Sequence, residues 1–139
     1  MGGEKYVKTE AFQGALNKAK NILGDKDKLN NVLKKVQDKM SNMSGLKKEM
    51  NAFLEKVLTF VRMIKAYISG VYKDIPIRSI LLMIAGLIYF ITPLDFLPDF
   101  IPGIGLIDDV GVILAIFNSI VDDVNRFRLF EEQSRIEDE

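Results

Sequence analysis

Four aspartates stand among proline, glycine and apolar residues in one short segment, residues 92–109. They are Asp95, Asp99, Asp108 and Asp109. Carboxylates in such surroundings can cap turns and helices, at about 1 kcal/mol each. In this use Asp95 and Asp99 would cap short turns, and Asp108 would cap a helix beginning at Asp109. Alternatively, the four carboxylates can converge on Ca²⁺ or Mg²⁺, or hold protons near a membrane boundary. Their spacing does not follow a calcium-binding loop, so the sequence leaves both uses open.

The same segment holds the residues that impose turns on the backbone. They are Pro93, Pro98, Pro102, Gly103 and Gly105. Proline lacks the backbone donor that a helix interior needs, and glycine adopts conformations that other residues avoid. The composition therefore predicts a connection between two helices, with the carboxylates displayed on it.

The residue types that the chain lacks narrow its chemistry. It contains no Cys and no His, which excludes thiolate chemistry, disulfides and cysteine-based zinc sites. It also removes the commonest general base and the commonest transition-metal ligand. No nucleophile and base stand together in the sequence, so we expect a protein that is not an enzyme and that uses no cofactor. A hydrolase that uses paired carboxylates is a more distant alternative.

A longer pattern surrounds the aspartates. It consists of Tyr89, Pro93, Asp95, Pro98, Asp99, Ile101, Pro102, Gly105, Asp108 and Asp109. In these residues the chain resembles the YkvA-like family, small and mostly bacterial proteins built around a domain of unknown function. The resemblance covers about residues 72–127, and Thr92 stands where the family pattern suggests Ser. It implies a small helical protein associated with a membrane, and it implies no established reaction.

Residues 75–94 form the most apolar stretch of the chain. Residues 79–94 carry no charge, and Arg78 lies near one end, where it can reach the membrane interface. The Ile, Leu and Phe residues of this stretch favour membrane insertion by about 3 to 7 kcal/mol. Twenty helical residues span about 30 Å, so the sequence predicts a transmembrane helix. The alternative is a buried central helix of a bundle.

A second apolar stretch, residues 110–121, is too short to cross a bilayer alone. If the stretch is extended back to residue 101, Asp108 and Asp109 lie near its middle. The free energy of membrane insertion is then about zero. A short span, a re-entrant segment and a helix held against the first all remain open. Gly111, Ala115 and Ser119 recur every four residues here. Such a ridge lets another helix approach closely, within the hairpin or from another subunit, although small residues also simply fill tight spots in a core.

Residues 1–74 repeat apolar positions at helical spacing, with lysines between the stripes. They hold 15 basic and 8 acidic side chains, against 4 and 11 in residues 75–139. The basic faces can meet solvent or lie against anionic lipid. Aromatic residues stand in the apolar stripes and do not alternate with the lysines, so we expect no nucleic acid as partner. Basic residues flank the apolar hairpin on both sides, which predicts that both termini face the cytoplasm.

The sequence therefore predicts an all-α protein in which amphipathic helices precede an apolar helical hairpin. We expect a basic helical region over residues 1–74, a YkvA-like membrane-associated hairpin over 75–127 and an acidic tail over 128–139. Within residues 126–139 we expect a helix end followed by a frayed tail. The leading function is a membrane-associated interaction or scaffold protein of a bacterial inner membrane, with lipid and a second copy or another protein as partners. The alternatives are a cation- or proton-binding membrane protein that uses the aspartates, and a soluble helical bundle that binds an apolar ligand or partner.

Overall fold

The computed structural model describes residues 2–42, 48–91 and 104–138, with side chains for residues 12–41, 51–91 and 111–136. All regular structure in these residues is helical, which confirms the all-α prediction. The helices are α1 (Gly2–Ile22), α2 (Lys26–Asn42), α3 (Lys48–Ser69), α4 (Ile77–Ile91), α6 (Ile104–Ser119) and α7 (Val121–Asp138).

The amino-terminal helices follow the apolar stripes of the sequence. The start of α2 is capped by Asp25, whose Oδ1 atom accepts a hydrogen bond from the backbone N–H of Lys28 at 3.1 Å. On its inner face α2 buries Leu29, Leu33 and Val36. The lysines of α1 and α2 from Lys18 to Lys35 are exposed, as a polar face between apolar stripes requires.

A glycine ends the longest helix, α3. Gly70 has a φ of 81°, a left-handed conformation that only glycine adopts without strain. The N–H of Gly70 donates a hydrogen bond to the carbonyl oxygen of Tyr67 at 3.2 Å, and the N–H of Tyr72 donates one to the carbonyl oxygen of Ala66. The chain therefore leaves α3 in a tight turn toward α4. That helix begins after Pro76, whose carbonyl oxygen accepts a hydrogen bond from the N–H of Ile80.

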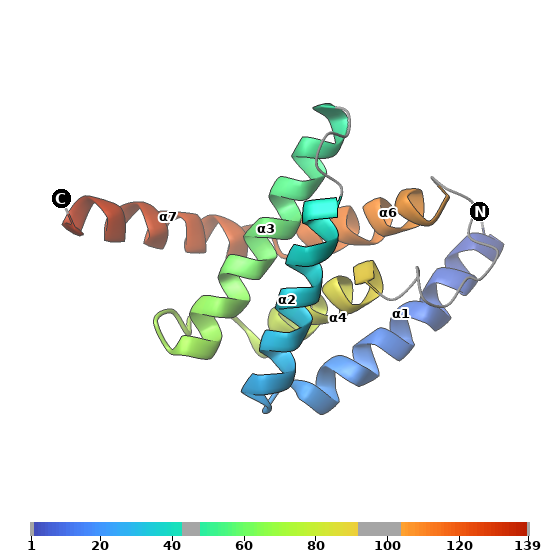
Figure 1. Ribbon diagram of the computed structural model, residues 1–139, viewed down its shortest axis with the longest axis horizontal. Helices are drawn as coiled ribbons and strands as arrows, with labels where there is room; N and C mark the ends of the chain where they lie inside the picture. Colours follow the sequence, from blue (N-terminus) through green and yellow to red (C-terminus); the bar gives the residue numbers. More distant parts are fainter. Residues whose placement is uncertain (1, 43–47, 92–103, 139) are drawn as a thin grey trace.

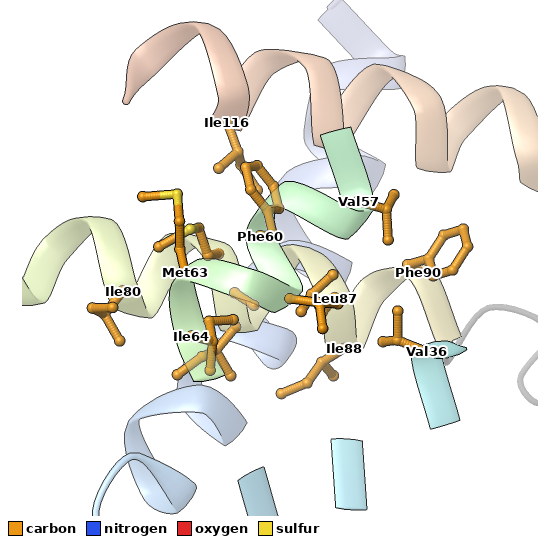
Figure 2. Close-up of a cluster of buried hydrophobic side chains, with 14 of the residues drawn as sticks. Val36, Val57, Phe60, Met63, Ile64, Ile80, Leu87, Ile88, Phe90 and Ile116 are labelled. Atoms are coloured by element: carbon orange, nitrogen blue, oxygen red, sulfur yellow. The ribbon is translucent and has the colours of Figure 1, made fainter. Parts of the chain in front are cut away.

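The apolar helix α4 lies at the centre of the bundle. It contacts α1, α2, α3 and α6, and its most extensive contact is with α1 (Figure 1). Its residues from Ser79 to Phe90 are buried, apart from two half-buried leucines. Around it, Val36 of α2, Phe60 of α3 and Ile116 of α6 contribute to one apolar cluster (Figure 2). Residues 1–74 and 75–127 thus share a single core.

The transmembrane prediction for residues 75–94 is not met by the described helices. Among residues 2–42, 48–91 and 104–138, no helix has both the length and the apolar character that a bilayer crossing requires. The described part of this stretch, α4, is buried among α1, α2, α3 and α6, as the alternative prediction of a central bundle helix requires.

The carboxy-terminal helix α7 extends away from the other helices (Figure 1). Hydrogen bonds from Ile120 N to Ile116 O and from Val124 N to Ile120 O, each 3.0 Å long, carry the backbone from α6 into α7 with little interruption. The helix continues to Asp138, so the predicted boundary between residues 127 and 128 falls within it. The prediction of a frayed tail is wrong, because residues 128–138 continue the helix.

Candidate functional site

The aspartate and proline segment lies only partly within the described residues. Outside them lie Asp95, Asp99, Pro93, Pro98, Pro102 and Gly103. Asp108 and Asp109 lie in the second turn of α6, because this helix begins at Ile104. The prediction that Asp108 caps a helix beginning at Asp109 is therefore wrong, and Gly105 is helical rather than part of a turn.

No cation site is formed by the carboxylates that the structure describes. Among those residues, no group of three or more acidic side chains is arranged to hold a metal ion. Because Asp95 and Asp99 lie outside that part of the chain, cation or proton binding by the aspartate segment stays a prediction.

A lysine from the amino-terminal region lies at the end of α4, directly before the aspartate and proline segment. The ammonium of Lys39 donates a hydrogen bond to the carbonyl oxygen of Phe90 and lies 4.2 Å from the centroid of the Phe90 ring. A cation at a helix carboxyl end interacts favourably with the helix dipole. The sequence offers no signal for this contact, since the two residues are 51 positions apart.

The small-residue ridge of α6 faces outward. Gly111, Ala115 and Ser119 are all exposed, and the hydroxyl of Ser119 donates to the carbonyl oxygen of Ile116. The inner face of α6 carries its isoleucines and Phe117 instead. The ridge therefore does not form the contact between α4 and α6, and its alternative use, contact with another subunit, stays a prediction.

The close approach between α4 and α6 depends on a glycine that the sequence reasoning missed. A Cβ atom at Gly86 would lie 2.7 Å from Cδ1 of Ile116 and 3.3 Å from Cδ1 of Ile113. Both distances are shorter than ordinary carbon contacts of about 3.5 to 4.0 Å. Gly86 therefore lets the isoleucines of α6 pack directly against the α4 backbone. Gly86 lies within the uncharged residues 79–94, where no sequence pattern distinguishes it from its apolar neighbours.

A polar cluster joins the start of α4 to the start of α7. The hydroxyl of Ser79 donates to Oδ2 of Asp123 at 2.5 Å, and Arg126 forms an ion pair with the same carboxylate. Tyr72 lies beside this cluster, and its ring contacts the rings of Phe127 and Phe130, with centroid separations of 5.3 and 4.7 Å. Burial, followed by the charge of Asp74, raises the pKa of Tyr72 above 10.0.

These contacts place the α3–α4 connection and the start of α4 against α7, and together the three form what we call the apolar end of the molecule. The large hydrophobic side chains that are exposed in the described residues all belong to these three elements, of which α7 extends away from the bundle (Figure 1). They are Val71 (65% exposed), Ile77 (49%), Val121 (38%), Leu129 (61%) and Ile136 (58%). Two exposed cations, Lys73 and Arg78, flank Val71 and Ile77. Exposed apolar side chains beside cations are typical of surfaces that meet a membrane interface or a partner.

The fold and this surface define a small all-α bundle with a buried apolar helix and an exposed apolar end. Residues 79–115, which include most of α4 and the first three turns of α6, match the family model described as "Protein of unknown function (DUF1232)". The chain is also 29% identical over 87 residues to the uncharacterized membrane protein YkvA of Bacillus subtilis (strain 168), an alignment that covers 63% of this chain and 82% of that protein. These matches confirm the resemblance to the YkvA-like DUF1232 family. No solved structure matches the chain significantly.

Proposed function

We propose that this chain is a membrane-associated interaction protein, without enzymatic activity, that attaches to the bilayer surface through its apolar end. One observation carries the proposal: the strongly exposed large hydrophobic side chains of the described residues gather on the α3–α4 connection, the start of α4 and α7. The name of the Bacillus relative, a membrane protein, supports the same assignment.

The α3–α4 connection is the best candidate for the inserted part. Val71 and Ile77 expose about half or more of their surface, and their transfer into the interface is worth roughly 1 to 2 kcal/mol each. Lys73 and Arg78 beside them add about 1 kcal/mol each against anionic headgroups. The total of about 4 to 6 kcal/mol supports reversible attachment. A chain held at the surface in this way keeps both termini on one side, in agreement with the predicted cytoplasmic placement at a bacterial inner membrane.

The interaction part of the proposal rests on the exposed ridge of α6. With the apolar end at the bilayer, the ridge residues Gly111, Ala115 and Ser119 stay uncovered by the described helices. Small side chains allow two helix backbones to approach closely. We propose a second copy of this chain as the partner there.

Vesicle flotation tests the attachment. The full chain is mixed with phosphatidylcholine vesicles, either alone or containing phosphatidylglycerol, and the bound fraction is measured. We expect binding to the anionic vesicles, and at least tenfold weaker partitioning for the double variant Val71→Ser with Ile77→Ser. The matched control is Lys34→Ser with Lys35→Ser, which alters exposed residues on α2 and should bind as the wild type does.

Circular dichroism establishes that each variant keeps its helices. If the Val71→Ser, Ile77→Ser variant floats with anionic vesicles as efficiently as the wild type does, attachment through the apolar end is wrong. Equal binding of the wild-type protein to both vesicle types would exclude the contribution assigned to Lys73 and Arg78.

A further inference from the structure

Two cations from different helices converge on one aromatic ring. The Nζ atom of Lys56, on α3, lies 5.2 Å from the ring centroid of Phe117. The Cζ atom of Arg128, on α7, lies 5.6 Å from the same centroid. The two charges are therefore at most about 11 Å apart, comparable to the screening length of about 8 Å in physiological salt. Both charges therefore contribute to the positive potential around this ring.

Neither cation has a carboxylate partner in the described part of the chain. Arg62 and Arg126, on the same two helices, are each paired with a carboxylate. For Lys56 and Arg128 no described carboxylate lies within ion-pair distance. Glu132 is one turn beyond Arg128 and exposed, and it makes no ion pair with that arginine. The positive charge of this pair is thus left uncompensated, although acidic residues are available on both helices.

The ring below the cations is held in place by the core. Phe117 is buried and stacks on the fully buried Phe60, with a centroid separation of 6.1 Å and an interplanar angle of 25°. Phe60 belongs to the apolar cluster between α3, α4 and α6 (Figure 2). Each cation gains about 0.5 to 1 kcal/mol from the ring face. The contact with the ring restricts each cationic side chain before a ligand arrives, which lowers the entropy lost on binding.

We propose that Lys56 and Arg128 form a binding site for a phosphate group. A phosphate carries one or two negative charges and several acceptor oxygens, so it can satisfy both cations at once. The planar guanidinium of Arg128 is suited to bidentate contact with two phosphate oxygens, and the ammonium of Lys56 supplies a point charge. The phosphate can belong to a lipid headgroup or to a free phosphate compound. The site uses neither Val71 nor Ile77 and does not depend on the proposed attachment.

Titration with two probes at constant ionic strength tests the site. The first probe is inorganic phosphate, followed by the amide resonances around Phe117 and Arg128 in the full-length protein, with chloride as the compensating salt. The second is phosphatidylcholine vesicles containing phosphatidic acid, followed by flotation. We expect saturable binding of at least one probe, weakened at least fivefold by Lys56→Gln and by Arg128→Gln. Lys35→Gln, which removes an exposed charge on α2, should leave binding unchanged.

The pattern of losses identifies the source of the phosphate. Loss of inorganic phosphate binding in both variants supports a free phosphate compound, and loss confined to the vesicles supports a lipid headgroup. Unchanged binding of both probes in the two variants would overturn the proposal, and so would an equal loss in Lys35→Gln. The phosphate site can be refuted while the double variant Val71→Ser with Ile77→Ser still shows reduced flotation. In that case the proposed attachment stands, so the two proposals can be refuted independently.

Discussion

Replacing Gly86 by Ala tests the packing of α4 against α6. The added Cβ atom would lie 2.7 Å from Cδ1 of Ile116, and such overpacking typically costs about 1 to 3 kcal/mol. Alanine returns about 1 kcal/mol through its higher helix propensity. The Cδ1 atom is the flexible end of its side chain and can yield a little. We therefore expect Gly86→Ala to lower the free energy of unfolding by about 0 to 2 kcal/mol.

A double-mutant cycle isolates the contact responsible. Ile116→Val removes the Cδ1 atom that the new Cβ would meet, and alone it should cost about 0.5 to 1.5 kcal/mol. In the double variant the 2.7 Å contact is gone, while the 3.3 Å contact with Cδ1 of Ile113 remains. Its loss of stability should therefore be smaller than the sum of the two single losses by about 1 kcal/mol. The assay is equilibrium unfolding in urea, followed by circular dichroism.

The matched control is Gly14→Ala in α1. A Cβ atom there would meet nothing within 4 Å, so only the helix propensity acts, and the protein should gain about 0.5 to 1 kcal/mol. Two results would refute the reasoning. One is an increase in the free energy of unfolding for Gly86→Ala that equals the increase for Gly14→Ala. The other is a double variant whose loss of stability equals the sum of the losses from Gly86→Ala and Ile116→Val.

Two further predictions concern the alkaline stability and the outer ridge. Because burial raises the pKa of Tyr72 above 10.0, the folded state holds the phenolic proton more tightly than the unfolded chain does. The stability that this proton contributes is complete below about pH 10 and is lost as the pH rises through the raised pKa. In urea unfolding, the free energy of unfolding of Tyr72→Phe should therefore fall less steeply at alkaline pH than that of the wild type. Equal falls in the two proteins would contradict this assignment. Replacing both Gly111 and Ala115 by Leu should abolish self-association on vesicles, measured by chemical cross-linking, without a loss of helix content. Unchanged cross-linking would remove the ridge as the contact between copies.

The amino-terminal helices could be predicted in detail because their evidence is local. In α1 and α2 the apolar residues recur at three and four positions, and Ala19, Leu29 and Val36 are buried as that period requires. The residue type of Asp25 suits a helix cap, and the hydrogen bond that it accepts from the N–H of Lys28 shows that it serves as one.

The candidate surfaces depended on contacts that a linear sequence does not display. The exposed ridge, the close approach at Gly86 and the ring shared by Lys56 and Arg128 each require knowledge of which helix faces which. Phe117 and Lys56 are 61 residues apart, so no short motif connects them. For the aspartate segment the sequence is the more informative source. Its residue pattern indicates the family, whereas no contact in the described part of the chain shows what its carboxylates do.

By itself the sequence determined the helical class, the apolar character of residues 75–94 and the resemblance to YkvA-like proteins. The tertiary structure decided how α4 is used. An apolar helix surface gains about the same free energy from burial in hydrocarbon or in protein, because the hydrophobic effect depends on the area removed from water and not on what covers it. Only the positions of α1, α2, α3 and α6 show that protein surrounds this helix (Figure 1). The same arrangement leaves Val71, Ile77 and Leu129 exposed at the apolar end.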